Sequence, residues 1–290
     1  MNWRIAALAL LGLAFALPGR ADSALHSLWE LHGKRNTVYV LGSIHTLRPQ
    51  DYPLAPVVMQ AYANSKAIVM EVDLERMDAM ELQAQMLSSA TLPEGRTLPQ
   101  ILGPQRYSRA AALARDIGVD LSTFDQFAPW FAAEAISQLQ LMELGFDPQS
   151  GVEMYFLDRA RGDGKHIDGL ETVQDQIALF AGLSMENQAE YLVSSLEQAR
   201  DLPKDVNDMV KAWQRGDTAW FESQMKTELG RDPALYDSVL AARNRKWLPK
   251  IEALLNEDKN YLVIVGTGHL VGRNSVIDLL RQDGVAAAQR

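Results

Sequence analysis

The chain has 290 residues, a formal net charge of -9 and 47% hydrophobic residues, which is typical of a globular protein with a sizeable core. It contains no cysteine, and this excludes disulfides, thiol catalysis and thiolate metal sites. Basic residues are scattered among acidic ones, which argues against a face that binds nucleic acid.

Residues 1–21 have the features of a secretory signal peptide. Arg4 supplies a positive start, and residues 5–17 form an apolar run that is too short to span a bilayer comfortably. Small residues predict cleavage after Ala21, and an uncleaved N-terminal anchor is the alternative. We therefore expect a periplasmic or secreted protein without stable membrane insertion, in which residues 22–290 form a single domain.

Several short stretches have the pattern of β-strands. Apolar, β-branched runs indicate strands that are buried on both faces, as in a mostly parallel sheet, and the last stretch is expected at an edge. In chain order the predicted strands are residues 27–32, 38–45, 67–73, 165–171, 261–265 and 285–288.

Helical patterns fill the intervals between these strands, and glycines and prolines separate the helices. The predicted helices are residues 57–64, 75–89, 98–102, 104–117, 124–143, 152–161, 172–181, 186–200, 204–215, 218–228, 233–255 and 275–281. The order predicts an α/β fold with a central, mostly parallel β-sheet flanked by helices. A large helical insertion is expected at about residues 75–162, and a second helical segment at about residues 172–256.

Two of the apolar runs end in the same pattern, Gly-x-x-His. Gly42 and His45 close the first of them, and Gly266 and His269 close the second. The glycine lets the backbone turn sharply at the end of the strand. Open α/β sheets bind ligands at the carboxyl ends of their strands, so we expect both histidines at one such edge.

Two further predicted strands end in a carboxylate, at Glu71 and Glu171. If the four strands share one sheet and one direction, these carboxylates join His45 and His269 at a single edge. Such a set can hold a divalent metal ion, or it can carry out general acid–base chemistry without one. The helical His-Glu-x-x-His signature and the Gly-x-Ser-x-Gly elbow are both absent, so neither of these hydrolase signatures applies.

The motifs resemble those of the TraB/GumN family, which includes the Tiki proteases, and they occur in the order of that family. The matching segments are residues 38–45, 52–54, 71–73, 129–130, 169–172, 243–244 and 266–272. The resemblance implies a mixed α/β fold that is shared with erythromycin-esterase-like and haem-uptake ChaN-like proteins. Tiki-like members are described as metal-dependent proteases, so it also implies a divalent cation (manganese, cobalt or zinc) and a peptide or small-molecule substrate.

The resemblance also assigns a site. It implies that His45, His269 and Glu71 form the centre of this site. Glu171 and Arg243 match the Gly-Leu-Glu and Arg-Asn elements of the family. The histidines and the carboxylates are then the candidate metal ligands, and Glu71 is alternatively the general base that acts on a bound water. Arg243 is expected to face a carboxylate or a developing oxyanion.

Other interpretations of these residues and of the function stay open. The histidines can be structural groups at strand ends, Glu71 can form a structural salt bridge with Arg243, and Glu171 can cap a helix that starts at Thr172. The protein can also sequester a peptide or small ligand without turnover, or bind haem or iron as its ChaN-like relatives suggest.

Overall fold

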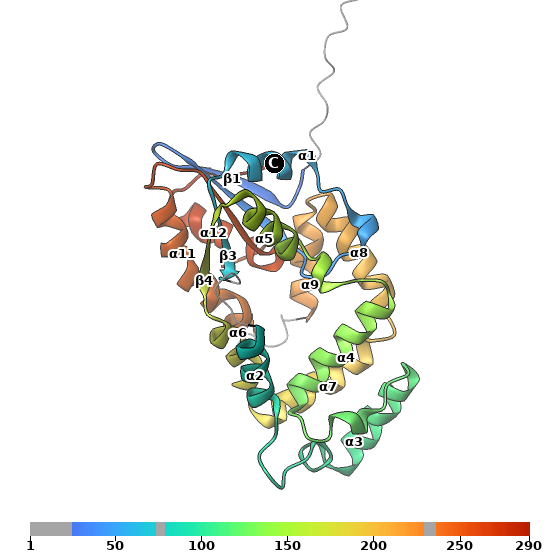
Figure 1. The fold of residues 1–290 in the computed structure, drawn as a ribbon. Coiled ribbons are helices and arrows are strands. Elements are labelled where there is room, and N and C mark those ends of the chain that lie inside the picture. Colours follow the sequence, from blue (N-terminus) through green and yellow to red (C-terminus); the bar gives the residue numbers. More distant parts are fainter. Residues whose placement is uncertain (1–24, 74–78, 229–235) are drawn as a thin grey trace, which may run out of the picture.

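The computed structural model describes residues 25–73, 79–228 and 236–290, and Figure 1 shows how they are arranged. The predicted signal peptide lies outside these residues, as do parts of the helices expected at 75–89 and 233–255. The strands form one sheet in the order β4-β3-β5-β2-β1-β6. They are β1 (Leu28–His32), β2 (Thr37–Ser43), β3 (Ala67–Val72), β4 (His166–Glu171), β5 (Tyr261–Gly266) and β6 (Ala287–Gln289).

The sheet is mostly parallel, which confirms the predicted α/β class. β5 is a parallel neighbour of both β2 and β3, and β3 is a parallel neighbour of β4. β1 is antiparallel to β2 and to β6, so the antiparallel pairs lie at one side of the sheet. The carboxyl ends of β2, β3, β4 and β5 therefore share one edge.

Most of the described chain outside the strands is helical. The helices are α1 (Pro56–Asn64), α2 (Ala79–Ala90), α3 (Leu98–Asp116), α4 (Pro129–Glu143), α5 (Val152–Asp163), α6 (Val173–Ala181), α7 (Met185–Gln198), α8 (Leu202–Gln214), α9 (Thr218–Glu228), α11 (Ala242–Leu254) and α12 (Val276–Gln282). Short 3-10 turns lie at η1 (Pro49–Asp51), η2 (Leu121–Phe124), η3 (Pro148–Ser150) and η5 (Thr267–Leu270). A π-turn, η4 (Asp237–Ala241), leads directly into α11.

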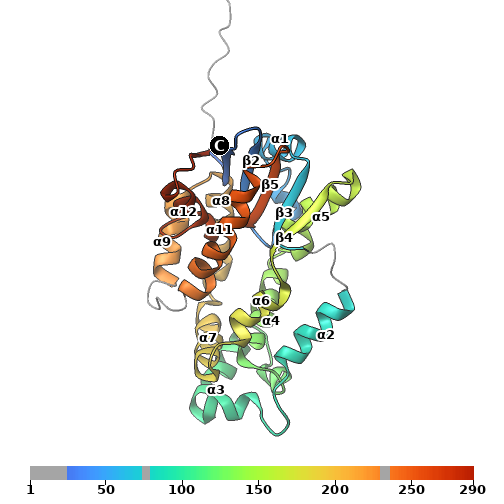
Figure 2. The ribbon, with the colours of Figure 1, turned by 90° about the vertical axis from the view of Figure 1, so that its left-hand side faces the viewer.

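The main core lies on both faces of the sheet. β3 and β5 are buried along their whole length, as their continuous apolar runs predict. Figure 2 shows α1 and α5 on one side of the strands and α11 and α12 on the other. Residues from α5, α11 and α12 belong to the same hydrophobic cluster as the strands.

A second hydrophobic cluster joins α3, α4 and α7 away from the sheet (Figures 1 and 2). Its buried members include Leu98, Ile136 and Leu192. α3 and α4 come before β4 in the chain and α7 comes after it, so this cluster combines helices from both predicted helical segments.

Two helix predictions differ in detail from the structure. The helix expected from residue 124 begins at Pro129, because the N–H of Ala128 donates to the carbonyl of Ala90 before the helix starts. Proline suits this first position, since it has no N–H to leave unpaired. The two helices predicted on either side of Gly103 form α3, whose kink lies at that glycine with φ 73°. No helix in the described ranges combines the length and the apolar character that crossing a bilayer requires.

Gly151, directly before α5, packs against the backbone of His45, and this contact generates a stability prediction. A Cβ at Gly151 would lie 2.1 Å from the carbonyl oxygen of His45. Because the contacted oxygen belongs to the main chain and cannot swing away, Gly151→Ala is expected to lower the free energy of unfolding by about 1–3 kcal/mol. Chemical denaturation measures this change.

Gly162, on α5 itself, is the matched control. A Cβ there meets nothing within 4 Å. Gly162→Ala should therefore stabilise the helix by about 0.5–1 kcal/mol. Equal effects of the two substitutions would contradict the proposed packing role of Gly151.

Candidate functional site

The two Gly-x-x-His segments lie side by side because their strands pair. Ser43 at the end of β2 is opposite Gly266 at the end of β5. The hydroxyl of Thr267 donates a hydrogen bond to the carbonyl of Ser43 at 2.9 Å. A Cβ on Gly42 would lie 2.8 Å from that hydroxyl oxygen, so the close approach of the two segments requires glycine. Both histidine-bearing turns therefore leave the same edge of the sheet.

The two carboxylates reach this edge from β3 and β4. The strands are paired so that Val72 lies opposite Glu171. Oε1 of Glu71 accepts a hydrogen bond from the backbone N–H of Gly266 at 2.7 Å. The side chains of Glu71 and Glu171 are only 9% and 7% exposed, so each buried charge needs a partner.

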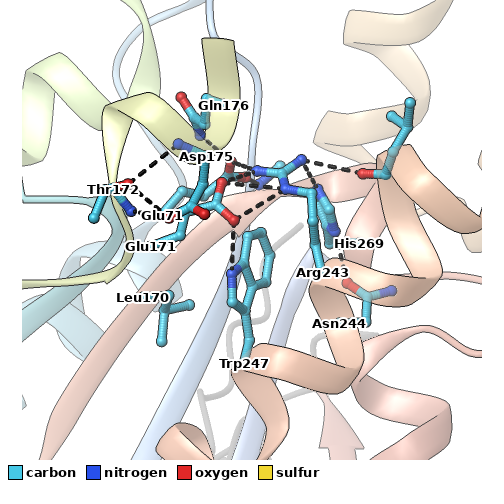
Figure 3. A network of polar contacts seen from close by, with 12 residues as sticks. Glu71, Leu170, Glu171, Thr172, Asp175, Gln176, Arg243, Asn244, Trp247 and His269 are labelled. Atoms are coloured by element: carbon cyan, nitrogen blue, oxygen red, sulfur yellow. Dashed lines mark hydrogen bonds and ion pairs between the residues drawn. The ribbon is translucent and has the colours of Figure 1, made fainter. Parts of the chain in front are cut away.

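The guanidinium of Arg243, near the start of α11, is the partner of both carboxylates (Figure 3). Nη2 lies 2.7 Å from Oε2 of Glu71 and 2.5 Å from Oε1 of Glu171, and Nε also donates to Glu171. Nη1 donates to Nε2 of His269 at 2.9 Å and to the carbonyl of Val239 at 3.2 Å. All five N–H bonds of the guanidinium thus have acceptors.

Asn244 and Trp247, also on α11, bind two of the partners of Arg243, His269 and Glu171. Oδ1 of Asn244 lies 2.6 Å from Nδ1 of His269, while its amide nitrogen donates to a backbone carbonyl. This arrangement assigns the ring proton to Nδ1 and leaves Nε2 as an acceptor. The ring centroid of Trp247 is 4.7 Å from the guanidinium carbon, and its Nε1 donates to Glu171 at 3.1 Å.

These buried side chains form one set, which we call the Arg243 network. Its members are Glu71, Glu171, Arg243, Asn244, Trp247 and His269. Burial lowers the pKa of His269 to about 3, and the nearby carboxylate of Glu71 offsets this only in part. The imidazole is therefore neutral at pH 7, as its role as a hydrogen-bond acceptor requires.

His45 lies outside this network and faces solvent, with its side chain 71% exposed. Its Nδ1 is 2.8 Å from Oε1 of Glu153, a carboxylate in the first turn of α5 whose side chain is 13% exposed. The hydroxyl of Ser43 donates to the same oxygen. Attraction to Glu153 raises the pKa of His45 to about 9, although the protein around the ring acts in the opposite direction. The ring is therefore positively charged at pH 7.

A small space beside Gly266 separates His45 from the Arg243 network. A Cβ on Gly266 would lie 3.3 Å from Oε1 of Glu71, 3.6 Å from Nε2 of His45 and 3.7 Å from Cδ2 of His269. A carboxylate oxygen and a ring nitrogen thus border the same space, whereas His269 presents a carbon atom to it. Burial alone would raise the pKa of Glu71, but the cationic ring of His45, the Arg243 guanidinium and the N–H of Gly266 lower it, so this carboxylate is ionised.

The four predicted metal ligands do not surround a common centre in this arrangement. Within the described ranges, no group of three or more histidine, aspartate or glutamate side chains is placed to hold a metal ion. The Arg243 guanidinium lies between the two carboxylates and Nε2 of His269, which a metal would have to bind. The contacts match the alternative in which Glu71 pairs with Arg243. Glu171 belongs to the same pairing and does not cap α6, since Thr172 accepts the capping hydrogen bond.

Sequence reasoning misses Glu153. In the sequence alone nothing distinguishes it from the acidic residues in the first turns of other helices, such as Asp175 and Glu186. The feature that could have pointed to Glu153 is its position two residues after Gly151, because this glycine lets α5 start against the carbonyl of His45. Only the tertiary structure identifies this glycine as a contact with the histidine-bearing turn.

A hollow of about 350 Å³ lies beside Glu171, at the carboxyl ends of β3 and β4. Its walls include the carboxyl groups of Asp73, Glu81 and Asp168, together with the amide of Gln174. The hollow adjoins the Arg243 network through Glu171, and both polar and apolar side chains line it. It thus offers room for a small molecule beside this carboxylate.

Comparison with known proteins shows that the sequence of this chain matches one family. A sequence model of the TraB/PrgY/gumN family matches residues 27–289. The uncharacterized protein YbaP of Escherichia coli (strain K12) is 23% identical over 87% of this chain and 90% of its own length. The metalloprotease TIKI2 of Xenopus tropicalis is 21% identical over 92% of this chain and 60% of its own length. No solved structure is significantly similar to the chain.

The contact between Glu153 and His45 generates a prediction about charge. Glu153→Gln removes the neighbouring negative charge, so the pKa of His45 should fall from about 9 toward its ordinary value of 6.5. An NMR titration of the His45 ring protons in chelator-treated protein measures this value. The folded-state pKa lies above the ordinary value, so the ion pair stabilises the fold fully below pH 6.5. Its contribution is lost as the pH rises through about 9.

Glu190→Gln, an exposed site on α7, is the control and should leave the titration of His45 unchanged. If the His45 pKa is the same in wild type and in Glu153→Gln, the contact with Glu153 does not set the charge of this ring.

Proposed function

This chain belongs to the TraB/PrgY/gumN family, and from this premise we propose that it is an exported hydrolase that cleaves peptide bonds. Distant relatives support the reaction class, since TIKI2 of Xenopus tropicalis and TIKI1 of Homo sapiens are named metalloproteases. Each is 21% identical to this chain, which covers 60% and 58% of their lengths. The bacterial relatives YbaP and a Treponema pallidum protein are named uncharacterized, so they do not narrow the substrate.

One observation carries the proposal: an exposed, cationic His45 and an ionised Glu71 border the same small space at the carboxyl edge of the sheet. Glu153 holds the ring of His45 at Nδ1, which leaves Nε2 directed toward that space. A proton donor and a proton acceptor are thus available side by side. Hydrolysis of an amide needs both, because water must lose a proton and the leaving amine must gain one.

The proposed chemistry uses these two groups in opposite roles. Oε1 of Glu71 orients a water and takes its proton as the oxygen attacks the peptide carbonyl. Nε2–H of His45 donates to the carbonyl oxygen as negative charge develops there, and its proton then goes to the leaving amine. A final proton transfer from Glu71 to His45 restores both groups.

Arg243 acts as a positioning residue in this scheme. Its five N–H bonds are already used inside the network, so none is free for an oxyanion of the substrate. Its bond to Oε2 of Glu71 instead turns Oε1 toward the space beside Gly266. His269 supports the same orientation by accepting from Nη1 of Arg243.

The metal dependence predicted from the family stays a proposal for this chain. The set of His45, His269, Glu71 and Glu171 does not fit a single metal ion as arranged, because the Arg243 guanidinium separates its members. Of these four residues, only His45 and Glu71 present a nitrogen or oxygen atom to the space beside Gly266. Manganese, cobalt and zinc are therefore tested separately in the experiment below, and the scheme above does not depend on them.

The proposal predicts that His45 and Glu71 are required for turnover. Chelator-treated protein is incubated with a peptide library, alone and with manganese, cobalt or zinc, and mass spectrometry measures cleavage. His45→Ala and Glu71→Gln should each lower kcat/KM by about 10²- to 10⁴-fold, because each removes a proton-transfer group. Circular dichroism checks that each variant is folded.

His166→Ala is the matched control, since His166 is an exposed histidine on β4 that lies outside the proposed chemistry. It should cleave at the wild-type rate. If wild type and His45→Ala cleave at the same background rate under every metal condition, the enzyme proposal fails. Activity that appears only after a metal is added would support a metalloprotease.

A further inference from the structure

We infer that Arg243 is the resident cation of this site and that its guanidinium keeps the surrounding carboxylates and imidazole from holding a divalent metal. This inference concerns metal binding and does not depend on the proposed catalysis. It rests on the contacts of the Arg243 network, taken one at a time.

The guanidinium has an acceptor for every one of its N–H bonds. Its Nη2 donates hydrogen bonds to Glu71 and Glu171, and its Nε donates to Glu171. Its Nη1 donates to His269 and to the carbonyl of Val239. An arginine has five N–H donors in a fixed planar fork, and each of them has an acceptor here. The guanidinium would lose these five hydrogen bonds if it left the site, so an ion from solvent does not displace it readily.

The nitrogen of His269 that could bind a metal is already occupied. A metal would bind the lone pair on Nε2, because Nδ1 donates its proton to Asn244. That lone pair already accepts from Nη1 of Arg243 at 2.9 Å. The imidazole thus has the tautomer and the supporting amide of a metal ligand, but its lone pair is directed at a guanidinium.

The charge of the guanidinium also opposes a metal ion at this place. The two carboxylates carry two negative charges, and the guanidinium neutralises one of them inside the protein. A divalent ion bound to the same oxygens would lie close to this buried cation, and repulsion is strong where water is excluded. The metal therefore has to replace the guanidinium and cannot join it.

Trp247 provides a surface that suits a guanidinium. This side chain is fully buried, and its ring centroid lies 4.7 Å from the Arg243 guanidinium carbon. Guanidinium groups are planar and weakly hydrated, so they pack well on an aromatic face. Trp247 also donates to Glu171, which fixes this carboxylate for Arg243.

Removal of the guanidinium should leave the carboxylates and His269 able to bind a metal ion. Oε2 of Glu71, Oε1 of Glu171 and Nε2 of His269 all converge on the guanidinium nitrogens. Two carboxylates and one imidazole are a donor set that suits zinc, cobalt or manganese. Arg243→Ala should thus convert the network into a metal site with an oxygen- and nitrogen-rich first shell.

The test is titration of chelator-treated protein with Co²⁺, followed by absorbance and by calorimetry. Wild type should show no tight Co²⁺ site that involves His269. Arg243→Ala should bind one equivalent of Co²⁺ at least about 100-fold more tightly than wild type does. The double variant Arg243→Ala/His269→Ala should lose this gain, and Arg243→Lys should bind as weakly as wild type because it keeps a cation. Weak binding by Arg243→Ala would overturn the inference.

A second measurement uses wild type alone, in case Arg243→Ala does not fold. Zn²⁺ is added to ¹⁵N-labelled protein, and the ring nitrogens of His269 and His45 are followed by NMR. The Nε2 resonance of His269 should stay unchanged, whether or not His45 responds. A zinc-induced shift of that resonance would show that a metal displaces Arg243, and it would overturn the inference. Catalysis is not measured, so either result leaves the hydrolase proposal to its own test.

Discussion

The structure of the site depends on one buried guanidinium. Arg243 joins β3, β4, α11 and the turn after β5 by bonding Glu71, Glu171 and His269. Two carboxylates that are less than one tenth exposed could not stay charged there without such a partner. Breaking a buried pair of this kind by removing one partner typically costs about 3–5 kcal/mol, because the remaining charge is left uncompensated. The geometry of the edge and the stability of the fold are therefore coupled.

The two Gly-x-x-His segments illustrate how surroundings decide chemistry. The same four-residue pattern ends two neighbouring parallel strands, yet the histidines differ in charge and in access to solvent. His45 is exposed and bound to the carboxylate of Glu153, so it is cationic. His269 is buried between Asn244 and Arg243, so it is neutral and accepts a hydrogen bond. Equivalence in sequence does not carry over to equivalence in charge or exposure.

The helices show a similar division between local and tertiary effects. Periodicity and proline or glycine breaks predict most of the helices, since these signals depend on neighbouring residues. The start of α4 is different, because residues 121–124 form a 3-10 turn and the hydrogen bond from the N–H of Ala128 to the carbonyl of Ala90 holds Ala128 extended directly before the helix. The cluster of α3, α4 and α7 joins segments from before and after β4, which no local pattern indicates.

The sequence by itself determined the α/β class, the parallel strands and the family, because buried apolar runs and the order of motifs can be read along the chain without its three-dimensional contacts. It also predicted that His45, Glu71, Glu171 and His269 lie at the ends of strands, and the parallel sheet brings those ends to one edge. Only the tertiary structure decided which of these groups touch and which are charged. The reason is that the side chains that set their charge, above all Arg243 and Glu153, lie on helices far away in the sequence. Contacts of that kind are fixed by packing, and a motif does not encode them.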